Sequence, residues 1–212
     1  MNFDRVAPFY TLLESVLAGP LMQRARRLSL EHIGPDDRVL LVGDGPGRFL
    51  EMLRRNHPLV QATSLDCSAA MLQRSRERLA SAKAGIGGLE WIHADAMTWP
   101  GNGKKFDVVV TQFVFDCHPP GSQQRLADQL TPMMGPGARW LVAEFQHAPR
   151  GWCRIRSQIL LALLYAFFRR ATRIPARQWA DPSPSLERAG WIRKSRKLMD
   201  AGWIYAECWK RP

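Results

Sequence analysis

The chain has 212 residues, of which 46% are hydrophobic and 23% charged. It therefore suits one globular domain with an ample core and leaves little room for a second. The four cysteines form no C-x-x-C pair, which argues against a zinc site or a disulfide framework. The first residues lack the apolar core of a signal peptide, so a reducing cytoplasm is the expected location.

The formal net charge of +11 is distributed unevenly. Residues 1–147 contain 16 Lys and Arg against 15 Asp and Glu, whereas residues 148–212 contain 14 against 4. The excess in the last third indicates an acidic partner there, namely a nucleic acid, an anionic membrane surface or an acidic substrate. A solvated basic face without a partner is the alternative.

Two helices are predicted before the first strand. Apolar residues recur at helical spacing from Phe3 to Leu17, and a second helix is expected from Leu21 to Ile33. Residues 34–37 then form a turn into the first strand. We expect residues 1–34 to form a helical cap, either over a ligand or packed on the sheet for stability alone.

The stretch from Val39 to Gly47 organises the rest of the chain. Four apolar residues lead into three alternating glycines, Gly43, Gly45 and Gly47, and an amphipathic run follows. This order predicts a buried parallel strand, a tight turn and a helix N-terminus whose N–H groups suit a carboxylate or phosphate. A dinucleotide fingerprint would need a further glycine where Arg48 or Leu50 stands.

The spacing Gly-x-Gly-x-Gly instead resembles the first motif of the class I S-adenosylmethionine-dependent methyltransferases. The opening segment from Asp4 to Tyr10 is similar to that of the quinone-biosynthesis (ubiquinone and menaquinone) methyltransferases, which folds over the cofactor. The resemblance implies that Phe9 and Tyr10 close the cofactor pocket. A glycine-rich turn without a ligand is the alternative for the loop itself.

A second strand is predicted from Val60 to Asp66. Asp66 follows Asp44 by 22 residues, close to the roughly 20-residue spacing at which a carboxylate reaches a ribose hydroxyl. The next helix runs from Met71 to about Lys83, with Ser68 as its N-cap. The pattern Asp-x-Ser-x-x-Met is similar to the family's second motif and implies that Asp66, Cys67 and Met71 contact the cofactor. A solvated strand end is the alternative for Asp66.

A short third strand is predicted near Leu89 to Ala96, with an acid at its carboxyl end. In the family, an acid followed by a small residue here accepts a hydrogen bond from the adenine amino group. Asp95 and Ala96 fit that pair. Met97 and Trp99 either flank the ring or belong to the core.

The segment from Phe106 to His118 is predicted to contain a fourth strand and its exit loop. Ligands of open parallel sheets bind beyond the carboxyl ends of the strands. We therefore expect Thr111 and Gln112 at the cofactor and the loop at the methyl acceptor. Asp116 and His118 are candidate general bases if that acceptor must lose a proton. A hydrogen-bonded loop acid and a surface histidine are the alternatives.

A helix from about Ser122 to Met134 and a turn at Gly135–Gly137 are predicted to precede a fifth strand, Arg139 to Phe145. The last two strands are Trp191 to Leu198 and Trp203 to Trp209, joined by a short glycine-containing loop. The predicted fold is a single α/β domain, residues 1–212, of the three-layer Rossmann-like methyltransferase type. It has a seven-stranded, mostly parallel sheet with a C-terminal antiparallel hairpin.

Between the fifth and sixth strands, residues 148–190 include an apolar run from Ile159 to Phe168 with arginines at both ends. Ten apolar residues are too few to span a bilayer, which needs about 20. A lid over a lipophilic pocket, or contact with an anionic membrane surface, is one interpretation of this segment. A helix buried in the core is the other.

The resemblance implies S-adenosylmethionine as the cofactor, with the glycines at the methionine tail, Asp66 at the ribose and Asp95 at the adenine. One departure is Leu41, where the family usually carries an acid that Asp44 could replace. The expected reaction is methyl transfer to a small, lipophilic acceptor, such as a quinone precursor or a lipid-like molecule. A nucleic-acid methyltransferase or RNA-binding module and a non-catalytic cofactor-binding scaffold are the alternatives.

Overall fold

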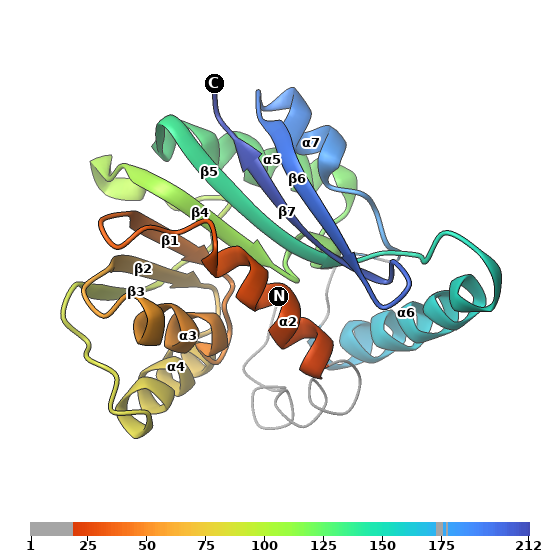
Figure 1. Ribbon diagram of the computed structural model, residues 1–212, viewed down its shortest axis with the longest axis horizontal. Helices are drawn as coiled ribbons and strands as arrows, with labels where there is room; N and C mark the ends of the chain where they lie inside the picture. The colour runs from red at the N-terminus through yellow and green to blue at the C-terminus, as the bar shows by residue number, and fades with distance from the viewer. Residues whose placement is uncertain (1–18, 173–175, 177) are drawn as a thin grey trace.

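In the computed structural model, residues 19–172, 176 and 178–212 are described. They contain a seven-stranded sheet of order β3-β2-β1-β4-β5-β7-β6 (Figure 1). The strands are β1 Arg38–Val42, β2 Gln61–Asp66, β3 Leu89–His93, β4 Phe106–Gln112, β5 Met134–Phe145, β6 Ile192–Met199 and β7 Ile204–Lys210. Strands β1 to β5 pair in parallel, whereas β7 runs antiparallel to both β5 and β6. The predicted seven-stranded, mostly parallel sheet is confirmed, with β7 inside the sheet and β6 at its edge.

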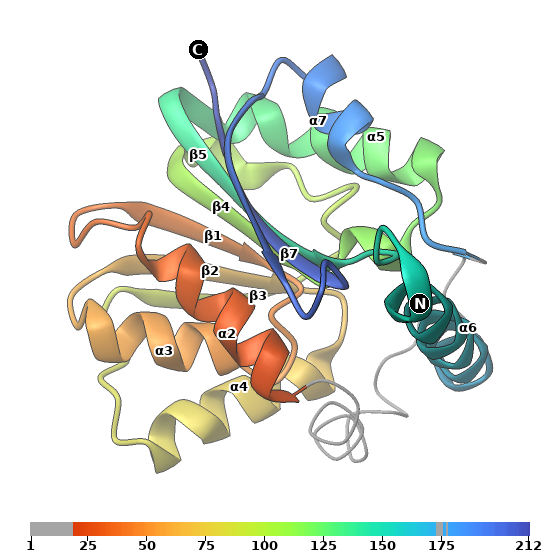
Figure 2. The same cartoon turned by 45° about the vertical axis from the view of Figure 1, so that its right-hand side comes forward.

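Helices cover both faces of the sheet. They are α2 Gly19–Leu30, α3 Arg48–Asn56, α4 Ala69–Ser81, α5 Pro120–Leu130, α6 Gly151–Thr172 and α7 Ser183–Arg188. Figure 2 shows α2, α3 and α4 on one side of the sheet and α5 and α7 on the other. The strand order reverses between β1 and β4, and open α/β sheets bind ligands beyond the carboxyl ends of the strands at such a point.

Successive side chains of the central strands alternate between two apolar cores, one on each face of the sheet. Val39 and Leu41 of β1 lie in the cluster with α3 and α4, whereas Leu40 and Val42 lie in the cluster with α5. Successive side chains of a strand point to opposite faces, so a strand covered on both sides reads as one continuous apolar run. The apolar lead into the glycine loop is therefore a consequence of helices on both faces.

Several predicted boundaries differ from the structure. Helix α5 ends at Leu130 and a short 3-10 turn, η3 Thr131–Met133, follows it, because Pro132 has no N–H to continue an α-helix. Strand β5 begins at Met134, so Gly135–Gly137 belong to the strand rather than to a turn before it.

Helix α6 lies beyond the carboxyl ends of the strands, apart from the two helical layers (Figures 1 and 2). It is 22 residues long, so the apolar run predicted at its centre is extended at both ends. Its buried residues Leu161 and Tyr165 pack in one cluster with Phe145 and Trp203. Helix α7, which also falls within the predicted lid, packs against α5 instead. No helix in the described part of the chain has the length and hydropathy needed to cross a membrane.

Candidate active site

The loop between β1 and α3 is free of side chains at three positions with left-handed backbone. Gly43, Gly45 and Gly47 have φ values of +66°, +58° and +77°. At Gly47, a Cβ atom would lie 2.9 Å from the Cα of Ser75 in α4, so the glycine also permits close packing of that helix. The Gly43 N–H donates to the carbonyl of Leu65 at 2.9 Å, which ties the loop to the end of β2.

Asp44 caps helix α3 from within this loop. Its carboxylate oxygens accept the backbone N–H groups of Phe49 at 3.0 Å and Leu50 at 2.9 Å. These are among the N–H groups that a helix N-terminus leaves without partners, and a negative charge is favourable there. Burial raises the pKa of Asp44 to about 6, although the hydrogen bonds and the charge of Arg26 act in the opposite direction. Both oxygens serve the helix, so the idea that Asp44 replaces the acid missing at Leu41 gains no support from this geometry.

Asp66 stands at the carboxyl end of β2 and connects the glycine loop to the next helix. It is 8% exposed. One oxygen accepts the N–H of Gly45 at 3.2 Å and the other accepts the N–H of Ser68 at 2.9 Å. The Ser68 hydroxyl in turn accepts the N–H of Met71 at 3.2 Å, which confirms the predicted N-cap of α4.

The end of β3 lies beside the end of β2. The Ala94 N–H donates to the carbonyl of Asp66 at 3.1 Å, and Asp95 follows in the chain as an exposed residue. Its Oδ1 accepts the N–H of Met97 at 2.9 Å. Ala96 is partly buried against the core cluster between the sheet and α5.

Cys67 and Met71 flank the same end of the sheet. Cys67 is exposed, and the ring of His93 lies with Nε2 3.2 Å from its carbonyl oxygen. Met71 is buried, and its sulfur lies 3.8 Å from the place that a Cβ on Gly45 would occupy. The structure thus brings the predicted residues of β1, β2 and β3 to one end of the sheet. That they bind the cofactor stays a prediction.

The two predicted residues on β4 point in different directions. Thr111 is fully buried, and its hydroxyl accepts the indole N–H of Trp140 at 2.8 Å. The Thr111 side chain therefore belongs to the core between the sheet and α5, and its contact with the cofactor stays a prediction. Gln112 projects from the other face and donates from Nε2 to the hydroxyl of Ser29 in α2 at 2.9 Å. Its buried Oε1 has no hydrogen-bond partner among the described residues.

The loop after β4 contains a short 3-10 helix, η2 Phe115–Cys117, which is fixed by a carboxylate from β5. Glu144 is 1% exposed, and its Oε1 accepts the N–H groups of Val114 at 2.9 Å and Phe115 at 2.8 Å. Sequence reasoning missed this residue. Its signal was an acid near the carboxyl end of the apolar fifth strand, the same kind of position that identified Asp66 and Asp95.

Three buried polar groups gather on or against this loop. Within the described structure, Oδ1 of Asp116, Oε2 of Glu144 and Nδ1 of His118 have no hydrogen-bond partner. Burial raises the pKa of Asp116 to about 6, opposed by hydrogen bonds from Cys117. Burial and the neighbouring charge of Asp116 raise the pKa of Glu144 well above its ordinary value. The pKa of His118 is lowered to about 4, mainly by burial.

Helix α6 covers this loop. The Tyr165 hydroxyl donates to the backbone carbonyl of Asp116 at 3.1 Å. Phe113 and Cys117 of the loop lie in the same apolar cluster as Leu161 and Tyr165 of α6. The surroundings of the loop on this side are therefore apolar, with a few buried polar atoms.

A buried arginine on α2 also faces the site and was not predicted. Arg26 is 4% exposed, its guanidinium lies 5.5 Å from the ring centroid of Phe113, and its charge lowers the pKa of Asp44. Helical spacing alone shows only which face of α2 is apolar, so nothing local marked this residue. The predicted contacts of Phe9 and Tyr10 lie outside the described residues.

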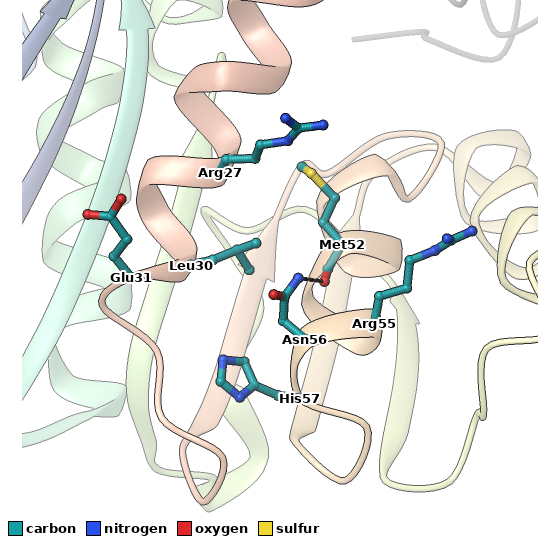
Figure 3. A pocket seen from close by; sticks show the side chains of 7 residues that line it. All are labelled: Arg27, Leu30, Glu31, Met52, Arg55, Asn56 and His57. Atoms are coloured by element: carbon teal, nitrogen blue, oxygen red, sulfur yellow. Dashed lines mark hydrogen bonds between the residues drawn. The ribbon is translucent and has the colours of Figure 1, made fainter.

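A pocket between α2 and α3 is a separate feature (Figure 3). It is lined by Arg27, Leu30, Glu31, Met52, Arg55, Asn56 and His57. These residues stand at the ends of α2 and α3 that lead into β1 and β2. The pocket is therefore at the amino ends of the strands, opposite to the glycine loop.

Comparison with known proteins identifies the fold and the chemistry. Residues 39–137 match a family model described as a methyltransferase domain. The chain is 29% identical to the demethylmenaquinone methyltransferase of Renibacterium salmoninarum, over 95% of this chain and 81% of that protein. It is 38% identical to the trans-aconitate 2-methyltransferase of Rhodopseudomonas palustris, over 51% of this chain and 41% of that protein.

Among solved structures, the N-methyltransferase NodS of Bradyrhizobium japonicum, in complex with S-adenosyl-L-homocysteine, is similar with a TM-score of 0.64. The likeness covers 90% of this chain and 85% of NodS at 18% identity, and at that identity it bears on the fold alone. Together with the strand order and the glycine loop, these findings support a methyltransferase that resembles the class I S-adenosylmethionine-dependent enzymes. S-adenosylmethionine is its cofactor, and the two relatives are named for small-molecule acceptors. Within the class it resembles the quinone-biosynthesis methyltransferases, as the Renibacterium protein shows.

Proposed function

We propose that the enzyme methylates a small, lipophilic acceptor such as a quinone precursor. The observation that carries this proposal is the apolar cluster that α6 forms with Phe113 and Cys117 on the loop after β4. Acceptors of Rossmann-like enzymes meet the cofactor beyond the carboxyl ends of the strands, where this loop lies. An apolar wall with few polar groups suits a lipophilic molecule better than a highly charged one. The similarity to a demethylmenaquinone methyltransferase supports the same choice.

The residues at the other side of the switch point fit S-adenosylmethionine. Left-handed glycines keep the loop open, so that the backbone of Gly43, Gly45 and Gly47 would meet the methionine tail. Asp66 would hold the ribose, and Asp95 with Ala96 the adenine. When bound, the cofactor supplies an activated methyl group on its sulfonium. The chain therefore has to bind the two reactants, align them at about 3–3.5 Å and exclude water.

Two further side chains extend this assignment. We assign Arg26 to the carboxylate of the methionine tail, because its buried charge already acts on Asp44 within the glycine loop. Gln112 would present its unpartnered Oε1 to the reactants from the end of β4.

Asp116 is the better of the two candidate bases. An effective general base has a pKa near the working pH. With a pKa of about 6, Asp116 is largely ionised at neutral pH and still basic enough to accept a proton. His118, with a pKa of about 4, is neutral but a much weaker base. Glu144 is a positioning residue, because it holds the loop through the N–H groups of Val114 and Phe115.

We also propose peripheral contact with an anionic membrane through the basic C-terminal third. A lipophilic acceptor partitions into bilayers, and residues 148–212 hold 14 basic residues against 4 acidic ones. Such a patch is attracted to anionic headgroups.

The test is a product assay by mass spectrometry with the purified enzyme and S-adenosylmethionine. A demethylated naphthoquinol, trans-aconitate and total RNA are offered in parallel. We expect methylation of the naphthoquinol. Methylation of trans-aconitate or RNA with none of the naphthoquinol overturns the proposed acceptor class. Calorimetric titration with S-adenosylmethionine, done beforehand, ensures that an inactive preparation is not taken for a wrong acceptor.

A further inference from the structure

Helix α6 has two apolar faces, and only one of them is buried. Ser157, Leu161 and Tyr165 are spaced four residues apart and pack onto the domain. The opposite face carries four large apolar side chains with exposed fractions of 74%, 48%, 53% and 61%: Trp152, Ile155, Ile159 and Leu163. Their spacing of three, four and four residues aligns them in one stripe along the helix. A contiguous exposed apolar stripe on a folded protein marks an interaction surface.

The stripe is surrounded by positive charge. Residues 145–180 contain seven arginines and no acidic residue. Arg150 and Arg154 at one end of α6 and Arg169 and Arg170 at the other are exposed. No ion pair is recorded for these four with any described residue, whereas Arg156, Arg193 and Arg196 all pair with carboxylates. The charges that flank the stripe are thus available to an external anion.

We propose that this face of α6 docks on the surface of an anionic phospholipid bilayer, with the helix lying in the plane of the interface. The inference rests on the proposed peripheral contact and assigns that contact to one surface. An apolar face flanked by arginines matches an interfacial helix, whose apolar side enters the acyl boundary while the basic side chains reach the headgroups. Helix α6 stands apart from the helical layers on both sides of the sheet, so a flat surface can reach it (Figures 1 and 2).

Charge complementarity selects this occupant over two others. A second copy of the chain would bring two sets of unpaired arginines together, and like charges across an interface are unfavourable. A nucleic acid would pair with the arginines but would leave the aliphatic side chains of Ile155, Ile159 and Leu163 without an apolar partner. A bilayer with anionic headgroups satisfies both components of the surface.

When α6 docks through its exposed face, its buried face stays in contact with the loop after β4. Tyr165 on that face donates to the carbonyl of Asp116 on the loop after β4. A molecule dissolved in the bilayer would therefore lie one helix diameter from the proposed acceptor loop.

The experiment is co-sedimentation of the full chain with vesicles of phosphatidylcholine alone and of phosphatidylcholine mixed with phosphatidylglycerol. No cofactor or acceptor is added. We expect binding to the anionic vesicles that decreases with salt, and little binding to the neutral ones. The double variant Ile159→Asp with Leu163→Asp should lose sedimentation. Arg169→Gln with Arg170→Gln should weaken binding about 25-fold, since each basic residue near an anionic surface contributes about fivefold.

The matched control is the double variant Leu59→Asp with Ile86→Asp, which changes two exposed apolar residues of 88% and 62% exposure on other loops. It should bind as the wild type does. Far-UV circular dichroism and thermal melting ensure that all variants are folded. If the control and the α6 variants lose vesicle binding equally, the assignment to α6 is overturned, while the peripheral contact stands.

Three other results also overturn it. They are equal binding to neutral vesicles, wild-type binding by the α6 variant, and a lipid-free dimer abolished by Ile159→Asp with Leu163→Asp. Failure of the wild-type enzyme to bind vesicles, together with turnover of a detergent-dispersed naphthoquinol, refutes docking and leaves the proposed reaction in place.

Discussion

The loop after β1 and the loop after β4 lie at the carboxyl ends of neighbouring strands, but their carboxylates are held differently. All four carboxylate oxygens of Asp44 and Asp66 accept backbone N–H groups. At the loop after β4, Asp116 and Glu144 each keep one buried oxygen without a partner in the described part of the chain. Buried polar atoms without partners are rare in folded proteins, and where they occur they often serve a function. Under the proposed function, the first loop would be a finished scaffold for the cofactor, whereas the second would keep polar atoms for an acceptor and its proton.

The largest expected effect is on turnover, from Asp116→Asn. Removal of a general base typically lowers the rate by about 10²–10⁴-fold, and kcat measured with the naphthoquinol should fall by that factor. Glu144→Gln is the matched control. The amide keeps an oxygen that can accept the N–H groups of Val114 and Phe115, so kcat should change by less than about tenfold. Equal losses in the two variants would show that the pair acts as a structural unit.

The same aspartate gives the reaction a defined pH dependence. Its pKa is raised from 3.8 to about 6, so the ionised base forms, and kcat should rise, as the pH passes through about 6.

The effect of the Asp116 ionisation on stability has the opposite sign. A carboxyl group with a raised pKa contributes stability that is fully present below pH 3.8 and is lost as the pH rises through about 6. Urea unfolding above pH 7 should accordingly show Asp116→Asn as more stable than the wild type, by as much as about 3 kcal/mol. A destabilised variant would contradict the buried charge.

The finished character of the first loop is tested by Gly47→Ala. The alanine would have to adopt a φ of +77°, and its Cβ would lie 2.9 Å from the Cα atom of Ser75. Gly190→Ala is the control, because its φ is +87° but no atom lies within 4 Å of the added Cβ. A left-handed non-glycine residue costs about 1–2 kcal/mol, and overpacking adds about 1–3 kcal/mol. The free energy of unfolding should fall by about 2 kcal/mol more in Gly47→Ala. Similar losses in both variants would mean that α4 moves aside.

Asp66→Ala measures the contribution of this scaffold to cofactor binding. Loss of a charged hydrogen bond should weaken the affinity for S-adenosylmethionine by about 1–3 kcal/mol, as measured by calorimetry. Asp107→Ala is a suitable control, because Asp107 pairs with Arg38 at the opposite end of the sheet. Its affinity for the cofactor should equal that of the wild type. An unchanged affinity in Asp66→Ala would refute its assignment to the ribose.

Local sequence patterns were sufficient to predict the loop after β1 but not the arrangement of side chains around the loop after β4. The first strand, the three glycines and Asp66 all lie within residues 39–66. The structure places the glycine turn after β1 and Asp66 at the carboxyl end of β2, as predicted. Thr111 could not be oriented, because β4 is buried on both faces and its apolar pattern has no alternation. Glu144 was missed because a single acid in an apolar strand has no local partner. Its role depends on N–H groups 29 and 30 residues earlier in the chain.

The smallest expected effect comes from Tyr165→Phe. It concerns how α6 supports the loop after β4, which is the proposed acceptor loop. The variant loses the hydrogen bond to the carbonyl of Asp116, which contributes about 0.5–1.5 kcal/mol. If that bond positions the loop, the KM for the acceptor should rise a few-fold, while the affinity for S-adenosylmethionine stays constant.

Tyr205→Phe provides the comparison for this variant, because the buried Tyr205 hydroxyl has no hydrogen-bond partner within residues 19–172, 176 and 178–212. Its removal should leave stability unchanged or slightly increased, since an unsatisfied buried hydroxyl is itself unfavourable. A rise in KM in Tyr165→Phe without one in Tyr205→Phe would place the effect at the loop. If instead both variants lost stability equally and neither changed KM, α6 would be packed against the domain without orienting Asp116.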